Sequence, residues 1–161
     1  MASVYFAHPW NTFGTQLETE LVAVIRANLR TLGDTRFVRS AVSLAARPDD
    51  GRPVDIVNPA DAEHQVGYDR AGMDYFREEV LPRCDACAFL AFRDGAITSG
   101  VVMEVEHFIA RGWPVWEVKL NGLLWRMQWL AQDRCLTHAQ SRARVYVDPT
   151  VPRHLRLLTA Y

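Results

Sequence analysis

What the sequence lacks excludes several classes of protein. Only three of its 161 residues are cysteine, and a chain of this length can bury roughly 70% of its unfolded surface without disulfides. No apolar run approaches the ~20 residues that span a membrane. The start "MASVYFAHPW" has no basic region and is interrupted by His8 and Pro9, unlike a signal peptide. We therefore expect a cytoplasmic protein.

Excess charge of either sign is also missing. The formal net charge is −1 and the isoelectric point is near 6.5, which gives no electrostatic reason to expect a nucleic-acid or membrane partner. Apolar residues make up 49% of the chain and charged residues 23%, as in ordinary globular proteins. We expect residues 1–161 to form a single compact domain.

The three cysteines do not form a recognisable metal or redox site. Cys84 and Cys87 make a C-x-x-C, but a structural zinc needs two more ligands and the sequence has no second C-x-x-C. A thioredoxin-like motif opens a helix after a strand, whereas this one closes a helix and enters the run "ACAFLAF". Together with Cys135, they are expected to be ordinary buried or half-buried thiols.

Several ligand-binding motifs are absent as well. The sequence contains no G-x-G-x-x-G after the first strand, no G-x-x-x-x-G-K-[ST], no H-E-x-x-H and no G-x-S-x-G. Its five histidines are scattered, and His8 alone follows a strand end that is expected to face a site. We expect neither a metal nor an organic cofactor.

Hydrophobic periodicity predicts alternating strands and helices. Expected strands cover 3–8, 54–59, 86–92, 114–118 and 143–147, and expected helices cover 14–33, 72–84, 99–111 and 120–133. Thr15 and Glu18 have the spacing of a capping box at the start of the first helix. Residues 34–53 are polar and broken, which is typical of a long loop, with room for a short helix at 41–46.

This order predicts an α/β fold: a flavodoxin-like, doubly wound, parallel five-stranded sheet with helices on both faces. Such sheets bind ligands beyond the carboxyl ends of their strands. The segments that follow those ends are His8–Thr15, Asn58–Asp61, Arg93–Gly100 and Lys119–Gly122.

Carboxylates are the best candidates for chemistry. Asp74, Asp94, Glu104 and Glu106 lie on or near the expected binding edge, and paired carboxylates suit glycosyl transfer, although solvated surface charge is the simpler interpretation of each. Glu104 and Glu106 flank an apolar helical stripe centred near Val105, on opposite sides. Periodicity therefore does not decide which of the two faces a pocket.

Four stretches and the last residue carry a resemblance to a known family. They are "VYFAHPW", "DYFREEVLPRCDACAFLAF", "GVVMEVEHFIARGWPV", "NGLLW" and the terminal Tyr161. Together they resemble the nucleoside 2-deoxyribosyltransferase family over most of the chain. In that register the family's nucleophile falls on Glu104, its aspartate on the middle helix falls on Asp74, and its first strand brings Tyr5 to the site.

The resemblance implies a mechanism without a cofactor. Glu104 would attack the anomeric carbon of a 2′-deoxyribonucleoside, Tyr5 would orient it, and Asp74 would contact the base and supply or relay its proton. His8, Trp10 and Asn121 would contribute to substrate binding. Partners would be a nucleoside or nucleotide, a free nucleobase and further copies of the chain, with Tyr161 reaching a neighbouring subunit's site.

Departures from the family pattern keep alternatives open. Where transferases have an aspartate, and related 5′-monophosphate hydrolases a serine, this chain has Thr98, followed by Ser99 and Gly100. These residues would bind a phosphate at a helix N-terminus, or one of them would be the helix cap. Asp94 would restore a nucleoside site from a longer loop. The alternatives to a transferase are a 5′-monophosphate N-glycosidase, a catalytically silent nucleotide-binding module and an NAD-cleaving domain.

Overall fold

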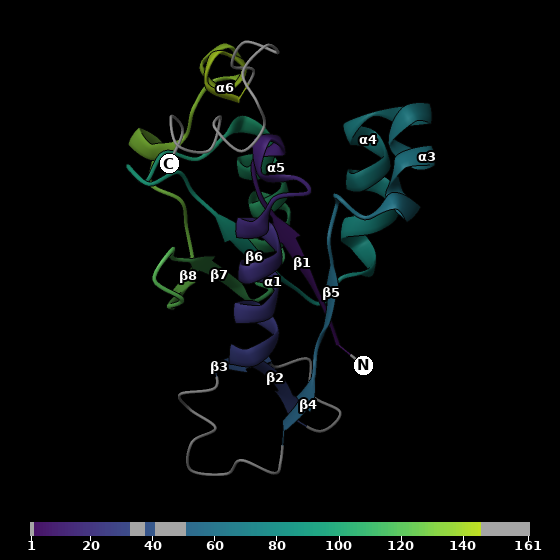
Figure 1. The fold of residues 1–161 in the computed structure, drawn as a ribbon, viewed down its shortest axis with the longest axis vertical. Helices are drawn as coiled ribbons and strands as arrows, with labels where there is room; N and C mark the ends of the chain where they lie inside the picture. The colour runs from purple at the N-terminus through teal and green to yellow at the C-terminus, as the bar shows by residue number, and fades with distance from the viewer. Residues whose placement is uncertain (1, 33–37, 41–50, 146–161) are drawn as a thin grey trace.

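The structure, a computed structural model, describes residues 2–32, 38–40 and 51–145 (Figure 1). The short helix expected at 41–46 and the terminal Tyr161 lie outside these residues. The main sheet has five strands in the order β5-β1-β6-β7-β8. They are β1 (Ser3–Ala7), β5 (Asp55–Val57), β6 (Ala86–Leu90), β7 (Val115–Val118) and β8 (Leu124–Met127). The first four are parallel, so the chain has an α/β fold with a mostly parallel sheet.

Helices connect the parallel strands. The α-helices are α1 (Gln16–Asn28), α3 (Ala62–Ala71), α4 (Met73–Tyr75), α5 (Ser99–Ile109) and α6 (His138–Val145). Shorter turns are η1 (Trp10–Thr12), η2 (Phe76–Val80), η3 (Leu81–Arg83) and η4 (Gln132–Arg134). The prediction for 99–111 is confirmed to within two residues, and Gly112, with φ of 66°, takes the left-handed conformation that ends the segment. Helix α3 was not predicted, because its segment has no clear apolar pattern.

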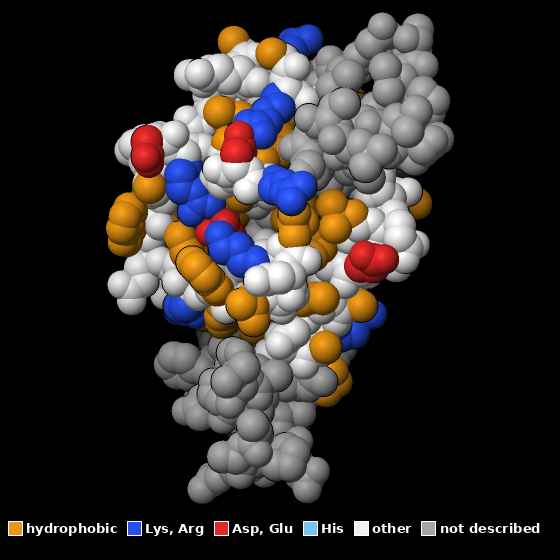
Figure 2. All heavy atoms as spheres, turned by 60° about the vertical axis from the view of Figure 1, so that its left-hand side comes forward, with side chains coloured by type: hydrophobic (Ala, Val, Ile, Leu, Met, Phe, Trp, Pro, Cys, Tyr) orange, Lys and Arg blue, Asp and Glu red, His pale blue; other side chains and the backbone are white. Residues whose placement is uncertain are grey.

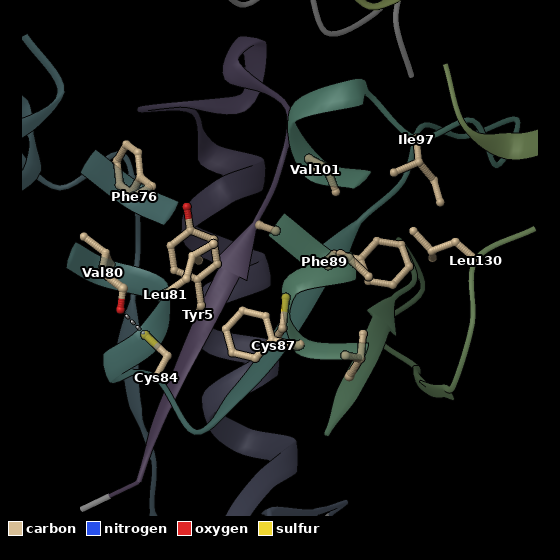
Figure 3. Packing of buried hydrophobic residues seen from close by; sticks show 14 of the residues in the cluster. Tyr5, Phe76, Val80, Leu81, Cys84, Cys87, Phe89, Ile97, Val101 and Leu130 are labelled. Carbon is tan, nitrogen blue, oxygen red and sulfur yellow. Dashed lines mark hydrogen bonds between the residues drawn. The ribbon is translucent and has the colours of Figure 1, made fainter. Parts of the chain in front are cut away.

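Alternating residues of β1 sort the core into two layers. Val4 and Phe6 pack with Ile25 of α1 in one buried cluster, whereas Tyr5 packs with Val105 of α5 in the other. Since successive side chains of a strand point to opposite faces, α1 covers one face of the sheet and α5 covers the other. Figure 3 shows part of the second cluster, where Tyr5, Phe76 and Phe89 come together from separate elements.

The helix predicted at 120–133 is wrong. This segment instead turns back, and β8 pairs antiparallel with β7. Gly122 has φ of 83°, Lys119 and Leu123 close the turn with a backbone hydrogen bond of 2.8 Å, and Asn121 accepts the Leu123 N–H. Several of its apolar side chains are exposed, including Trp129 at 69%, whereas Leu130 is buried in the core. A hairpin needs only this short turn, so no helical crossover is required.

The strand predicted at 143–147 is also wrong over its described part. Residues 143–145 belong to α6, in which Ser141 and Val145 are the buried positions, at the i, i+4 spacing of one helical face. Residues 146–147 lie outside the described part of the chain. The fifth strand of the sheet is therefore the antiparallel β8, and the all-parallel prediction fails at that edge.

The region after α1 contains strands where a helix end and a loop were expected. The helix ends at Asn28, and β2 (Leu29–Leu32) pairs with β3 (Val38–Ser40) and β4 (Gly51–Pro53) in a small antiparallel sheet. Leu29 is already extended, with φ of −107° and ψ of 136°. This sheet lies at the opposite end of the molecule from α6 (Figure 1).

The face on the β8 side mixes cations with aromatic rings. Figure 2 shows Lys and Arg side chains interleaved with hydrophobic ones on this face. The Lys119 ammonium lies 4.7 Å from the centroid of the Trp125 ring, and the Arg126 guanidinium lies 4.9 Å from that of Trp116. The first of these cation–π contacts covers part of the exposed Trp125 ring, and the second lies against the buried Trp116 ring.

A buried ion pair fastens η4 to β7. The Glu117 side chain is 3% exposed and accepts two hydrogen bonds from Arg134, at 2.7 and 3.0 Å, and one from Lys119. Arg134 Nε donates to the carbonyl of Gly95 at 2.7 Å, which ties the loop before α5 to the same pair. Burial alone would raise the pKa of Glu117, but the hydrogen bonds from Arg134 and Lys119 outweigh it and lower the pKa.

We expect Arg134→Ala to destabilise the fold by roughly 3 kcal/mol, because it leaves the buried Glu117 carboxylate with fewer partners. The control is Arg70→Ala, which removes an exposed ion pair with Glu79 and should cost no more than about 1 kcal/mol. Urea unfolding at neutral pH measures both. Since the pKa of Glu117 is lowered on folding, the contribution of the pair is present above the usual carboxyl pKa and is lost as the pH falls through the folded value. Equal losses in the two variants would contradict this.

Candidate functional site

A cavity of about 360 Å³ opens at the carboxyl ends of β1 and β5. Its wall is formed by residues that follow those strands, by α3 to η2, by the N-terminal part of α5 and by residues along the whole length of α6. The lining residues are His8, Pro9, Trp10, Phe13, Pro59, Ala60, His64, Gln65, Tyr68, Met73, Phe76, Thr98, Ser99, Gly100, Val101, Glu104, His138, Ser141, Arg142 and Val145. This is the edge of the sheet at which the sequence predicted ligand binding.

Glu104 is the only carboxylate among these lining residues. It is 5% exposed, and the hydroxyl of Tyr5, which is fully buried, donates a hydrogen bond of 2.7 Å to its Oε1 atom. Burial raises the pKa of Glu104 to about 8, and the hydrogen bond from Tyr5 opposes that rise. The same burial and the neighbouring carboxylate hold the pKa of Tyr5 well above its usual value, so Tyr5 stays a donor.

The structure separates the two glutamates that periodicity left equal. Glu104 faces the cavity, whereas Glu106 is exposed and does not line it. A buried carboxylate with a raised pKa responds strongly to charge placed beside it. A substrate that develops positive charge next to Glu104 would favour its ionised form, in which it can act as a nucleophile.

Thr98, Ser99 and Gly100 line the cavity at the start of α5. Thr98 occupies the N-cap position, but its side chain makes no capping hydrogen bond. The Ser99 N–H donates to the hydroxyl of Ser141 at 2.8 Å, which holds α6 against this helix start. A Cβ added at Gly100 would meet nothing within 4 Å, so the backbone there borders open space. Polar groups of two helices therefore meet at this end of the cavity.

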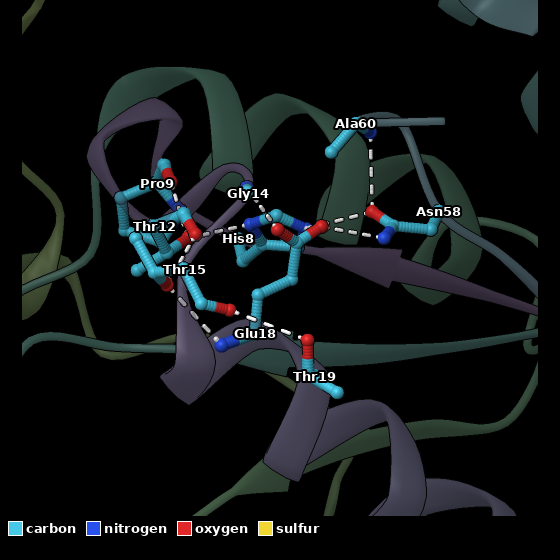
Figure 4. A network of polar contacts seen from close by, with 9 residues as sticks. All are labelled: His8, Pro9, Thr12, Gly14, Thr15, Glu18, Thr19, Asn58 and Ala60. Carbon is cyan, nitrogen blue, oxygen red and sulfur yellow. Dashed lines mark hydrogen bonds and ion pairs between the residues drawn. The ribbon is translucent and has the colours of Figure 1, made fainter. Parts of the chain in front are cut away.

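His8 lines the cavity and belongs to a buried polar network (Figure 4). Its Nδ1 lies 2.6 Å from the Thr12 hydroxyl, and its Nε2 lies 3.0 Å from Asn58 Oδ1. That Oδ1 also accepts the Ala60 N–H at 3.1 Å, and Asn58 Nδ2 donates to Glu18 at 2.5 Å. Since Oδ1 is an acceptor, His8 Nε2 carries a proton. Burial lowers the pKa of His8, opposed by Asn58 and by Glu18.

The network joins the two loops that border the cavity. Glu18 accepts hydrogen bonds from Asn58, after β5, and from the Gly14 N–H, after β1. The predicted capping contact is present, because the Glu18 N–H donates to the Thr15 hydroxyl at 3.3 Å. The carboxylate of Glu18, however, accepts hydrogen bonds from Gly14 and Asn58, and not from the Thr15 N–H as in a capping box.

An aromatic wall on the α3 and α4 side was not predicted from the sequence. His64, Tyr68, Met73 and Phe76 line the cavity there. The ring of His64 lies 5.6 Å from that of Phe76, centroid to centroid. His64 and Tyr68 stand one helical turn apart, and that i, i+4 spacing was the available signal in a segment without a clear apolar pattern.

Besides Tyr5, which lies beneath Glu104, three predicted site residues within the described part of the chain do not line the cavity. Asp74 is 63% exposed in its side chain and pairs with Arg77 at 2.8 Å. Asp94 is 57% exposed in its side chain and pairs with Arg144 at 2.8 Å. Asn121 is exposed in the turn before β8. All three lie where solvent satisfies a polar side chain. His8, Trp10, Thr98, Ser99, Gly100 and Glu104 do line the cavity, with Tyr5 directly beneath.

Comparisons of the chain with family models, with curated proteins and with solved structures find no match. Within the described residues, no group of three or more His, Cys, Asp or Glu side chains is arranged to hold a metal ion. The same part of the chain contains no helix whose length and apolar character would let it cross a membrane. The site is therefore interpreted from its own geometry.

The raised pKa of Glu104 predicts a pH-dependent stability that Glu104→Gln removes. The pKa rises from its usual 4.5 to about 8 on folding, so the folded state holds an extra proton between these values. Wild-type protein then loses stability as the pH rises through that window, and the Gln variant does not. Between pH 4 and pH 9, the free energy of unfolding of the variant, measured with urea, should rise relative to that of the wild type by on the order of a few kcal/mol. The control Glu106→Gln, at an exposed site, should show the same change of stability with pH as the wild type. The interpretation is contradicted if Glu104→Gln does so too.

Proposed function

We propose that the protein transfers a 2′-deoxyribosyl group between nucleobases through a covalent intermediate on Glu104. The observation that carries this proposal is the buried Glu104 carboxylate, held by the Tyr5 hydroxyl at the wall of a cavity of about 360 Å³. That volume is within the range of small-molecule sites. The aromatic wall suits a flat base, and the hydroxyl-bearing start of α5 suits a sugar.

The proposed reaction has two displacements at the same carbon. An Oε atom of Glu104 attacks C1′ of the substrate, the C1′–N bond breaks, and its electron pair leaves with the base. A second base, or water, then attacks C1′ and releases Glu104 as a carboxylate. Because each step inverts C1′, the product retains the configuration of the substrate. Tyr5 holds Glu104 in place throughout and stabilises its ionised form.

The order of the strands supports the flavodoxin-like arrangement that we propose for the fold. Counted along the sheet, the strands in chain order run 2-1-3-4-5, the order of flavodoxin-like sheets. The antiparallel β8 is the departure from that pattern. The cavity lies beside β1, where the connections change direction and such sheets bind their ligands.

One observation favours a second candidate, an N-glycosidase acting on 2′-deoxynucleoside 5′-monophosphates. The start of α5 shares its end of the cavity with His138 and Arg142 of α6. Backbone N–H groups at a helix start and an arginine are the groups that bind phosphate. The carboxylate that would repel a phosphate there is missing, because Asp94 lies outside the cavity.

Intact mass tests the shared covalent step. After incubation with a deoxynucleoside or its 5′-monophosphate, we expect wild-type protein to gain one deoxyribosyl or phosphodeoxyribosyl unit. Glu104→Ala should form no adduct and lose activity by about 10⁴-fold or more, because the nucleophile is gone. Glu106→Ala, an exposed neighbour on the same helix, should retain most of the activity. Loss in Glu106→Ala alone would contradict the assignment, and binding without an adduct or base release would indicate a silent nucleotide-binding module.

Substrate comparison separates the two candidates. Base exchange from a deoxynucleoside to a free acceptor base supports the transferase, whereas base release from the monophosphate alone supports the glycosidase. If the monophosphate is the substrate, Arg142→Ala should raise its KM by about 10-fold or more, the loss expected for one charge-assisted contact. The same variant should leave the KM of the free deoxynucleoside within about twofold. Equal effects on both substrates would remove the phosphate-binding role.

A further inference from the structure

The cavity has two chemically different ends. Thr98, Ser99 and Arg142 form the polar end, whereas Tyr68, Met73 and Phe76 form an end dominated by rings and a thioether. Glu104 follows Gly100 by one turn of α5, which places it on the same helical face as the polar end. A nucleoside that presents C1′ to Glu104 with its sugar against α5 therefore has its base against α3 and η2.

A leaving base needs a proton, and the residue predicted to supply it is not available at this end. Asp74 points to solvent and pairs with Arg77. His64 is the imidazole at the aromatic end, and it is 7% exposed. An imidazole is the side chain best suited to donate a proton near neutral pH. The geometry around His64 therefore decides whether it can replace the aspartate.

The two ring nitrogens of His64 have different surroundings. Nδ1 lies 3.1 Å from the hydroxyl of Tyr75, which fixes the ring at that side. Nε2 is enclosed and has no hydrogen-bond partner. The nearest acid is Glu63, whose Oε1 lies 3.7 Å from Nε2 and whose side chain is 78% exposed. A buried polar atom without a protein partner is uncommon, and such an atom is usually satisfied by a bound water or by a ligand.

Gly67 makes the contact between Tyr75 and His64 possible. A Cβ added at Gly67 would lie 2.3 Å from Cε2 of the Tyr75 ring, so any larger residue would displace that ring. His64, Gly67 and Tyr68 share one face of α3 by their i, i+3 and i+4 spacing. The glycine lets the ring of Tyr75 lie directly against α3, where its hydroxyl reaches Nδ1. A partly buried tyrosine thus orients the histidine at the wall of the cavity.

We propose that His64 is the catalytic acid and base that serves the nucleobase, an inference that rests on the proposed function. The proton donor is the imidazolium form of His64. As Glu104 attacks C1′ and the C1′–N bond breaks, the electron pair goes to the base, which takes the proton from His64 Nε2. His64 is then a neutral imidazole that keeps its proton on Nδ1. In the second step, His64 takes the proton from the incoming base or water as C1′–N or C1′–O forms and the bond to Glu104 breaks. Tyr75 is a positioning residue, because it acts through Nδ1.

The test uses pairs of substrates that differ in their need for a proton. The first of each pair is an unmodified deoxynucleoside that the wild type cleaves. The second is 7-methyl-2′-deoxyguanosine for a purine enzyme or 5-fluoro-2′-deoxyuridine for a pyrimidine enzyme, whose bases leave readily without protonation. We expect His64→Asn to lose about 100- to 10,000-fold in kcat on the unmodified substrate, the usual contribution of general acid catalysis. It should lose less than about 10-fold on the activated one.

Two further variants keep the result interpretable. His107→Asn alters another histidine whose Nε2 has no partner and which does not line the cavity, and it should leave both rates unchanged. Tyr75→Phe removes only the hydroxyl at Nδ1 and should lower the unmodified rate by a smaller factor, again sparing the activated substrate. If circular dichroism shows that His64→Asn does not fold, the ratio of the two rates in Tyr75→Phe, on the unmodified and the activated substrate, tests the proposal instead.

The outcomes are distinct. Selective loss on the unmodified substrate supports the assignment. Equal rates in His64→Asn and wild type, or equal loss on both substrates in a folded variant, would overturn it while leaving Glu104 chemistry intact. Failure of wild-type protein to release a base from any substrate would overturn the proposed function and this inference with it. Glu104→Gln should be inactive on both members of a pair, which separates the nucleophile from the acid.

Discussion

The hydrogen bond between Tyr5 and Glu104 is the constraint around which the site is built. Its partners are 99 residues apart in the sequence, one on the first strand and one on the helix after β6. A buried carboxylate without a donor would be costly, so β1 and α5 must meet at this place for Glu104 to be tolerated in the core. The burial of Tyr5 and the packing of α5 on the sheet are both consequences of that meeting.

The same constraint explains why the cavity lies where it does. Tyr5 lies in the middle of β1 and faces α5. The strand ends at Ala7, and the next residue, His8, therefore lies beside the site and lines the cavity. Hydrogen bonds to the Glu18 carboxylate hold the loops after β1 and β5 together, one from the Gly14 N–H and one from Asn58. On the other side, Glu117 and Arg134 fasten Gly95 in the loop that leads to α5. Glu18 and Glu117 thus hold the loops of the wall through several hydrogen bonds each, whereas Glu104 accepts one, from Tyr5, among the described residues.

Sequence periodicity predicted those helices and strands whose apolar residues are buried in the fold. The strand at Ala86–Leu90 is buried at every residue, and α5 buries one stripe, so periodicity located both. The hairpin at β8 exposes Trp125 and Trp129, and a pattern of apolar residues carries no information on whether they are buried. Glu104 was distinguished from Glu106 only by resemblance, since the two flank the stripe symmetrically. His64 depends on contacts between α3, Tyr75 and Gly67 that local sequence does not encode.

The charge on Glu104 links the two ends of the proposed site. With a pKa of about 8, the carboxyl group is mostly protonated at neutral pH, a resting state that suits its burial but not the role of nucleophile that we propose for it. In the proposed reaction, positive charge that develops at C1′ as the base departs lowers that pKa, and protonation of the base promotes the departure. A proton delivered at the aromatic end thereby helps to ionise the carboxylate on α5. Glu104 and His64 therefore need no contact with each other in the proposed site, because each acts on the same substrate.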